Sequence, residues 1–247
     1  MTRFELSRTR RAEADLACQF DHILVTSPSD RKALLGLVPL EKSPSETSVL
    51  PNGVDLDYFH PNAGVERQPE TIVFSGKMSY HANISMVKYL VDEIMPRIWK
   101  LRPAAQLYVV GKDPSPAIRQ LSQNPLIIVT GTVDDIRPYL WRAAVSVVPL
   151  LYGVGIQNKI LEAMATGTPV VTTCRALSAL QAQPGKDLLA YDDPDRFAEA
   201  VLRLIADRSL QQRIGDAAVT HIRTHHNWTS ITSQLLTIYQ EISSSKT

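Results

Sequence analysis

Along the chain, short apolar runs alternate with longer segments in which apolar residues recur every three or four positions. That recurrence places the apolar residues on one face of a helix, whereas a short β-branched run between turn residues is typical of a buried strand. The clearest helical pattern covers residues 84–101, with a kink expected at Pro96. Three further helices are predicted at 194–207, 210–226 and 229–243. Strands are predicted at 71–74, 107–110, 127–130, 145–148, 170–173 and 188–191.

Strands that alternate with amphipathic helices predict βαβ units and a parallel sheet covered by helices on both faces. We therefore expect a Rossmann-like α/β domain. Such sheets bind ligands at the carboxyl ends of their strands. Glycine-bearing turns follow four of the predicted strands, at Gly76, Gly111, Gly131 and residues 153–155, and a nucleotide crevice is expected where they meet. No G-x-G-x-x-G motif stands in that context and no Walker lysine motif occurs, so a dinucleotide cofactor or an NTPase is not favoured.

The N-terminal part follows a different pattern. A weakly periodic helix is expected at 4–20, a short strand at 22–26, and a helix at 30–37 that follows the capping sequence Ser27-Pro28-Ser29. Residues 39–48 contain proline and serine and are expected to form a connection. The turn sequence Pro51-Asn52-Gly53 and the breakers after it place a domain boundary between about residues 50 and 70.

Composition narrows the function classes. The 247 residues include 44% hydrophobic and 21% charged residues, which is ordinary for a globular protein. A net charge of +1 gives no reason to expect nucleic acid as a partner. No stretch reaches the ~20 apolar residues of a transmembrane segment, and the basic N-terminus precedes no apolar signal-peptide core. Cys18 and Cys174 lack metal-ligand or redox spacing and are expected to be buried and reduced, which predicts a cytoplasmic protein.

The stretch from Gly153 to Val171 carries the clearest chemical signal. Two glycines follow an apolar run and precede a helix-like segment, which stops at Gly167 before the next β-branched run. A strand, a glycine turn and a helix start together present free backbone N–H groups and the positive helix end, which attract phosphate. Lys159 and Glu162 are three residues apart and share one helical face. They would suit a diphosphate and ribose hydroxyls, although either could instead be a solvated surface group.

The same residues resemble a known family. The run Gly155-Ile156-Gln157-Asn158-Lys159, followed by Leu161-Glu162-Ala163-Met164-Ala165 and Gly167-Thr168-Pro169-Val170-Val171, resembles the donor-site signature of family 4 glycosyltransferases. Within that family the chain most resembles bacterial sugar transferases linked to exosortase and exopolysaccharide systems. The resemblance continues through Gly76-Lys77-Met78, Gly131-Thr132-Val133 and Asn227-Trp228, and covers about residues 22–240.

The resemblance implies the GT-B architecture, in which one Rossmann-like domain binds the acceptor and a second binds the donor. Residues 51–227 would form the C-terminal, nucleotide-sugar-binding domain, and residues 228–247 a C-terminal helix. Residues 1–50 would be a remnant of the N-terminal acceptor domain together with the linker. The rest of the acceptor domain would then be missing, or be supplied by a separate polypeptide.

The resemblance also implies roles for individual residues. Lys159 would neutralise the leaving diphosphate, and Lys77 stands where many members carry an arginine against the donor phosphates, although an exposed loop lysine is the alternative. Glu162 would bind the ribose, as the second glutamate of the family's paired-glutamate motif. Val133, after Gly131-Thr132, resembles the position of the loop whose backbone contacts the nucleobase in the family. The other predicted substrate-binding residues are Gly76, Gly111 and Asn158, with Gly155, Ile156 and Gln157 as donors of backbone N–H groups.

Two positions depart from the family pattern. The first glutamate of the paired motif falls at Val154, and the lysine usually found five residues after the phosphate-binding arginine falls at Ala82. The pocket would then carry less positive charge, or Lys159 would carry more of it. Asp55-Leu56-Asp57 superficially matches a D-x-D metal motif, but its position after a turn favours turn acceptors, so no metal is expected.

The resemblance therefore predicts a retaining glycosyltransferase donor domain that transfers a sugar from a uridine or guanosine diphosphate sugar to a hydroxyl of a sugar or lipid-linked acceptor. It implies polysaccharide or glycoconjugate synthesis without a cofactor, in the cytoplasm or peripherally at the inner membrane. A truncated, non-catalytic or partner-dependent nucleotide-sugar-binding module is the alternative. An epimerase or a phosphorylase of similar architecture is a weaker one, and no Lys-centred pyridoxal motif supports the phosphorylase.

Overall fold

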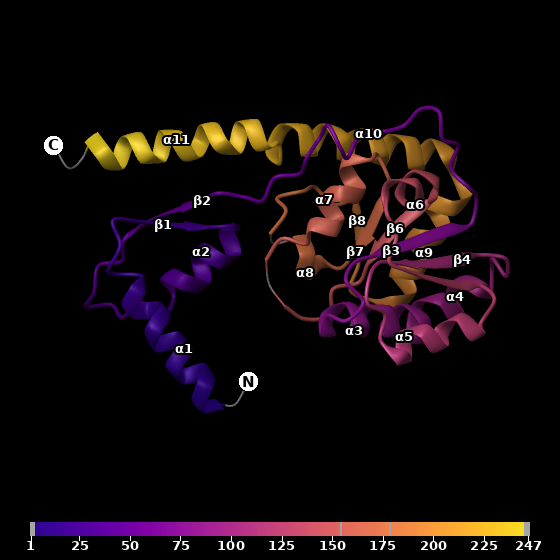
Figure 1. The fold of residues 1–247 in the computed structure, drawn as a ribbon, viewed down its shortest axis with the longest axis horizontal. Helices are drawn as coiled ribbons and strands as arrows, with labels where there is room; N and C mark the ends of the chain where they lie inside the picture. Colours follow the sequence, from indigo (N-terminus) through magenta and orange to yellow (C-terminus); the bar gives the residue numbers. More distant parts are fainter. Residues whose placement is uncertain (1–2, 154, 178, 245–247) are drawn as a thin grey trace.

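The computed structural model describes residues 3–153, 155–177 and 179–244 (Figure 1). Within these ranges the chain forms a two-stranded and a six-stranded sheet. The strands are β1 (His22–Val25), β2 (Glu46–Val49), β3 (Thr71–Ser75), β4 (Gln106–Val110), β5 (Ile127–Gly131), β6 (Val145–Val148), β7 (Val170–Thr172) and β8 (Leu189–Ala190). The helices are α1 (Arg3–Leu16), α2 (Pro28–Leu35), α3 (His81–Tyr89), α4 (Met95–Trp99), α5 (Pro116–Gln120), α6 (Arg137–Arg142), α7 (Asn158–Ala165), α8 (Cys174–Leu177), α9 (Pro194–Ala206), α10 (Arg208–His225) and α11 (Trp228–Ser244), with a π-helical segment η1 (Leu90–Ile94) and a 3-10 segment η2 (Leu121–Gln123).

The six-stranded sheet is parallel throughout, in the order β5-β4-β3-β6-β7-β8. The chain moves outward from β3 to β5, crosses back to β6 beside β3, and continues in the other direction to β8. The point between β3 and β6 is therefore the switch point of the sheet. Right-handed crossovers in opposite directions place α3 and α7 on opposite faces, so helices cover both sides (Figure 1). The predicted parallel α/β sheet is confirmed, with its six strands and the three C-terminal helices each within two residues of the expected ends.

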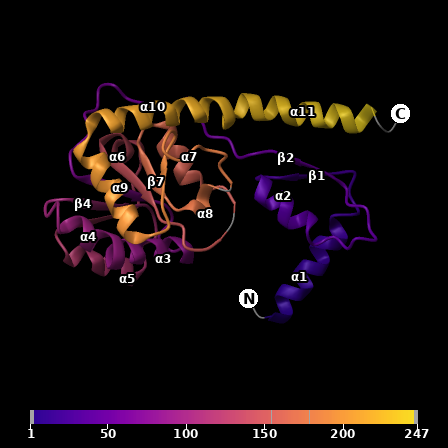
Figure 2. The same ribbon diagram turned by 180° about the vertical axis from the view of Figure 1, so that it is seen from behind.

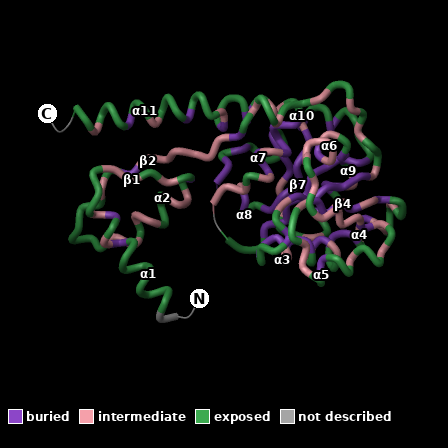
Figure 3. The backbone as a smooth tube through the Cα atoms, viewed as in Figure 1, coloured by how far each residue is buried: buried purple, intermediate pink, exposed green. Residues whose placement is uncertain are grey.

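Burial is concentrated in the six-stranded sheet. Every residue of β3 and β6 is buried. Figure 3 shows the same contrast along the backbone, because purple segments cluster in this sheet and its helices while the N-terminal unit and α11 are largely green. With both faces covered, polar groups of this sheet can meet a ligand only at the ends of its strands.

The kink predicted at Pro96 takes the form of a π-helical segment. One continuous helical stretch runs through α3, η1 and α4, with Pro96 in the first turn of α4. The N–H of Met95 donates to the carbonyl of Leu90, one residue further back than in an α-helix. Proline lacks an N–H group and its ring crowds the preceding turn, so a wider turn before it lets the helix continue.

The N-terminal unit contains the expected α1, β1 and α2 and the unexpected β2. Ser27 caps α2, as predicted, by accepting a hydrogen bond from the N–H of Asp30 at 3.1 Å. The connection predicted at 39–48 is wrong at its end, because Glu46–Val49 forms β2 and pairs in parallel with β1. The polar sequence of β2 has no apolar run, so its strand character becomes visible only in the pairing with β1.

Two expectations from composition can be compared with the structure. The prediction that both cysteines are buried is wrong: Cys174 is exposed at the start of α8 and Cys18 is half-buried, although both are free thiols. The N–H of Cys174 donates to the carboxylate of Asp192 at 2.9 Å. Among the helices of the described ranges, none combines the length and the apolar character needed to cross a membrane.

The linker between the two sheets meets the junction of α10 and α11 at one place. Val54 donates its N–H to the carbonyl of His226 at 2.8 Å and forms an isolated parallel bridge with Asn227. Gly53 lies so close to the Trp228 ring that a Cβ atom would stand 2.5 Å from it. From this joint, α11 extends away from the six-stranded sheet, as Figures 1 and 2 show. The linker and the C-terminal helix therefore leave the sheet together.

Gly215 sets how closely α10 packs against the turn after α7. A Cβ atom there would stand 2.3 Å from the carbonyl oxygen of Gly167. Alanine in a helix interior is normally about 1 kcal/mol more favourable than glycine. We expect Gly215→Ala instead to lower the free energy of unfolding by roughly 1–3 kcal/mol, because α10 must move away. Urea unfolding measures the change, and Ala217→Gly on the same helix reports the propensity term alone. A gain in stability from Gly215→Ala would contradict the close packing.

Candidate functional site

The candidate site lies at the switch point between β3 and β6. Open parallel sheets bind ligands in the crevice that forms there, outside the carboxyl ends of the strands. The turn after β3 begins at Gly76, and the loop after β6 leads through Gly153 and Gly155 into α7. The predicted convergence of glycine turns on this edge follows from the parallel strand order.

The glycines of this edge divide into two classes. A Cβ atom at Gly111 would stand 1.9 Å from the carbonyl oxygen of Gly76, and one at Gly76 would stand 2.8 Å from the amide nitrogen of Asn83. Both glycines also have φ near +147°, where L side chains are strained. Gly131 and Gly155, by contrast, have positive φ and nothing within 4 Å of a built Cβ. Close packing thus explains the first pair, against backbone at Gly111 and against the side chains of Asn83 and Lys159 at Gly76, whereas the second pair borders open space.

Helix α7 keeps Lys159 and Glu162 outside its buried face, and Lys159 reaches the turn after β3. Its buried residues are Ile160, Leu161, Ala163, Met164 and Ala165. Lys159 and Glu162 lie outside that buried set and are half-buried. Gln157 precedes the helix in an extended conformation, and its side chain caps none of the helix N–H groups. The start of α7 therefore keeps uncapped donors and the positive end of the helix dipole.

Lys159 is held by neutral groups. Its ammonium donates a hydrogen bond to the amide oxygen of Asn83 and lies 4.6 Å from the centroid of the Phe74 ring. It also stands 3.0 Å from the place where a Cβ of Gly76 would be. Burial lowers the pKa of Lys159 to about 8, and the nearby carboxylate of Glu162 opposes this change. The site thus contains a cation that is partly removed from water.

Glu162 has an unusual environment for a half-buried carboxylate. Among the residues that the structure describes, no hydrogen bond or ion pair reaches its side chain. In the same part of the chain, every fully buried side-chain N or O atom has a partner, so the Glu162 oxygens face accessible space. Burial raises the pKa of Glu162, and the charge of Lys159 lowers it. This carboxylate can accept hydrogen bonds from a ligand without breaking any contact described here.

The other predicted residues are distributed around this pair. Lys77 is exposed and its ammonium lies 4.0 Å from the carboxylate of Asp113, in the neighbouring turn after β4. Asn158 turns towards the linker, where its Oδ1 accepts from Asn52 at 2.9 Å. Ile156 packs against the core, while Gly155 and Gln157 are half-buried. Val154, at the position of the first glutamate of the paired motif, lies outside the described residues.

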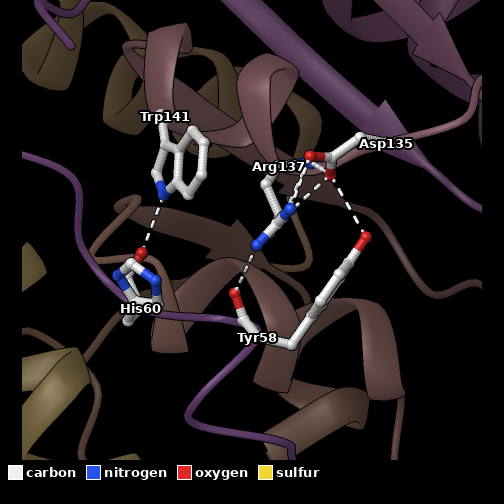
Figure 4. A network of polar contacts seen from close by, with 5 residues as sticks. All are labelled: Tyr58, His60, Asp135, Arg137 and Trp141. Carbon is white, nitrogen blue, oxygen red and sulfur yellow. Dashed lines mark hydrogen bonds and ion pairs between the residues drawn. The ribbon is translucent and has the colours of Figure 1, made fainter.

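The loop that carries Val133 is fixed by contacts with the linker (Figure 4). Val133 itself is half-buried against the core. Next to it, Arg137 pairs with Asp135 at 2.8 Å and stacks 3.9 Å above the Tyr58 ring. Trp141 donates from its ring N–H to the carbonyl of His60 at 2.7 Å. The linker therefore restrains the turn after β5, at the outer end of the same sheet edge.

Sequence reasoning missed the residues of α3 that face the site. Asn83 is 6% exposed and contacts Lys159, as described above. The Tyr152 hydroxyl, in the loop after β6, lies 3.0 Å from Nδ1 of His81 and 2.9 Å from the Ser85 hydroxyl. These side chains fasten both the loop and the start of α7 to the first turns of α3. No sequence signal indicates this, because the partners are far apart along the chain and follow no motif.

Comparison with known proteins places the chain in a family. The family model described as glycosyl transferases group 1 matches residues 69–207, more than half of the chain. The chain belongs to the group 1 glycosyl transferases. The match begins just before β3 and ends after α9, so it includes every element of the candidate site.

Individual members of the family are distant. The chain is 27% identical over 221 residues to phosphatidyl-myo-inositol mannosyltransferase of Mycobacterium tuberculosis (strain H37Rv), which covers 83% of this chain and 57% of that protein. It is 25% identical over 253 residues to alpha-maltose-1-phosphate synthase of Mycolicibacterium smegmatis, covering 90% of this chain and 64% of that enzyme. The chain thus spans a little over half the length of the curated relatives it matches.

Solved structures show the same fold. Sucrose-phosphate synthase from Thermosynechococcus elongatus matches with a TM-score of 0.78 at 21% identity, covering 97% of this chain and 62% of that one. The HepE protein of Anabaena, solved in complex with UDP, also has a TM-score of 0.78, at 16% identity, with coverage of 98% and 70%. The arrangement of this chain is therefore that of the GT-B glycosyltransferases.

We expect Lys159 in the ligand-free protein to lose its proton near pH 8, well below the 10.5 of an ordinary lysine. Between these values the folded protein binds fewer protons than the unfolded chain. The cost of burying the charge is therefore complete below about pH 8 and declines as the pH rises towards 10.5. The pH dependence of the acetylation rate of Lys159, followed by mass spectrometry, gives the midpoint.

Glu162→Gln should lower the midpoint of Lys159 further, because the Glu162 carboxylate raises the pKa of Lys159 and the variant removes that effect. Glu199→Gln, an exposed change on α9, is the matched control. A midpoint at or above 10.5 in the unmodified chain would contradict the partial removal of the ammonium from water.

Proposed function

We propose that this chain forms the donor-binding half of a glycosyltransferase that transfers a sugar from a nucleoside diphosphate sugar to a hydroxyl acceptor. One observation carries the proposal: Glu162, an accessible carboxylate that has no partner among the residues the structure describes, stands one helical turn from the half-buried cation Lys159. Both lie on the helix that starts at the switch point of the sheet, where ligands of this fold bind. In a nucleoside diphosphate, the ribose hydroxyls would donate hydrogen bonds to Glu162 and the diphosphate oxygens would accept them from Lys159.

Each group would have a separate task in this reaction. The leaving diphosphate gains negative charge as the bond to the sugar breaks, and preorganised donors that face it lower the barrier. Lys159, Lys77 and the backbone N–H groups of residues 155–157 would supply that positive potential. Glu162 would accept hydrogen bonds from the ribose hydroxyls. The chemistry then depends on charge placement alone and uses no cofactor.

The nucleobase would lie further along the same edge. A pocket at the ends of β4 and β5 is lined by residues that include Asp113, Arg119, Thr130, Gly131 and Thr132. It lies beside the turn that carries Val133, whose backbone would contact the base. The HepE structure contains UDP, which makes UDP the first nucleotide to test. Guanosine diphosphate, which the resemblance of the donor-site signature also implies, is the second candidate.

The wider assignment also belongs to this proposal. Because the chain spans a little over half the length of its curated relatives, the acceptor, whether a sugar or a lipid-linked sugar, would be bound by an N-terminal domain of the complete enzyme. Membership of family 4, a retaining outcome, a role in exopolysaccharide synthesis and a cytoplasmic location are what the donor-site signature implies. The short N-terminal unit and α11 would belong to the interface between the two halves.

Isothermal titration with UDP, GDP, ADP and CMP tests the donor site. We expect a diphosphate to bind, and Lys159→Ala and Glu162→Gln each to weaken it about tenfold or more, because the first removes a charged donor and the second removes the charge of the acceptor. The controls Lys88→Ala on α3 and Glu199→Gln on α9 change the same charges at exposed positions and should leave affinity unchanged. Failure of all four nucleotides to bind, or equal losses in controls and site variants, would remove the proposal.

A further inference from the structure

Asn83 joins the two sides of the switch point. It lies in the first turn of α3 and is 6% exposed. Its side-chain nitrogen donates to the carbonyl of Lys77 at 2.8 Å, and its side-chain oxygen accepts from the ammonium of Lys159. The first bond holds the turn after β3, and the second holds the helix after β6. One buried amide therefore connects the two segments between which the proposed diphosphate would bind.

The contact is compact and leaves the ammonium partly unused. Gly76 lies against both partners, since its missing Cβ would stand 2.8 Å from the Asn83 nitrogen and 3.0 Å from the Lys159 nitrogen. The Phe74 ring lies 4.6 Å from the ammonium. An ammonium group has three N–H donors, and within the described residues Asn83 is its one hydrogen-bond acceptor. Two donors thus stay available for a ligand.

The chemical type of the partner decides what Lys159 can do. A carboxylate at this position would form an ion pair and cancel the charge in a partly dehydrated place, where such pairs are strong. An amide oxygen orients the ammonium through a hydrogen bond but carries no net charge. The positive charge therefore stays available for an anion. Ala82, at the position of the usual family lysine, is buried, so no second ammonium stands beside Asn83 from that position.

We propose that Asn83 is a positioning residue, which fixes the Lys159 ammonium above the Gly76 turn without neutralising it and so prepares it for a diphosphate. This inference rests on the proposed donor function. If Asn83 had a purely structural role, limited to its bond with the Lys77 carbonyl, substitutions at Asn83 would leave the protonation midpoint of Lys159 unchanged, and their effect on binding would not depend on Lys159.

The first test needs no nucleotide. Asn83→Asp places a carboxylate beside the ammonium, and we expect the acetylation midpoint of Lys159 to rise clearly above about 8. Lys88→Ala, an exposed change on the same helix, is the control and should leave the midpoint unchanged. A Lys159 midpoint that is the same in Asn83→Asp and in the unmodified chain would overturn the contact. This measurement is decisive even if no nucleotide binds, which would count against the proposed function alone.

The second test is a double-mutant cycle with UDP as the probe. We expect Asn83→Ala to weaken binding roughly 5–20-fold in the native background and hardly at all in Lys159→Ala, because Asn83 acts through that lysine. Asn83→Asp should weaken binding at least as much, although it conserves size. Equal losses in both backgrounds would show that Asn83 acts by itself and would overturn the proposal. If Asn83→Ala does not fold by circular dichroism, Asn83→Ser retains a donor for the Lys77 carbonyl and completes the cycle.

Discussion

The structure keeps a positive charge at the switch point by surrounding it with neutral partners. Within the described residues, Lys159 has no carboxylate at ion-pair distance, and its ammonium contacts an amide oxygen and an aromatic ring. Such a charge is unfavourable in a partly buried place unless something accepts its remaining hydrogen bonds. The arrangement persists because α7 is fixed by five buried residues and by the close approach of α10 at Gly215. The packing of the core thus compensates for the unfavourable partial burial of the Lys159 charge, which an anionic ligand would reduce.

The glycines of the sheet edge contribute to this arrangement in two ways. Gly111 is required because a Cβ there would meet the carbonyl of Gly76, and Gly76 is required because its missing Cβ leaves room for the side chains of Asn83 and Lys159. Gly131 and Gly155 have positive φ beside open space, so their backbone conformation, not packing, requires glycine. The first pair builds the wall of the site. The second pair leaves room for a ligand to approach the backbone.

Membership of the group 1 glycosyl transferases agrees with this geometry, and the chain also modifies the pattern from which its donor site was predicted. Ala82 is buried in the first turn of α3, where the family signature usually has a lysine. The adjacent Asn83 turns to Lys159, which concentrates the buried positive charge in one side chain. The two halves of the site are therefore connected by hydrogen bonding as well as by sheet pairing. The linker cluster around Arg137 restrains the outer end of the same edge.

The sequence by itself determined the elements of the sheet, because apolar periodicity is local: six strands, their parallel direction and the polar face of α7 with Lys159 and Glu162 all follow from short-range patterns. The tertiary structure alone decided which groups meet. Asn83 and Lys159 are 76 residues apart, and β2 becomes a strand only through pairing with β1. The exposure of Cys174 likewise depends on how the connection after β7 is covered. Contacts between distant segments depend on how the elements connect and pack, and short-range sequence patterns carry no information about that.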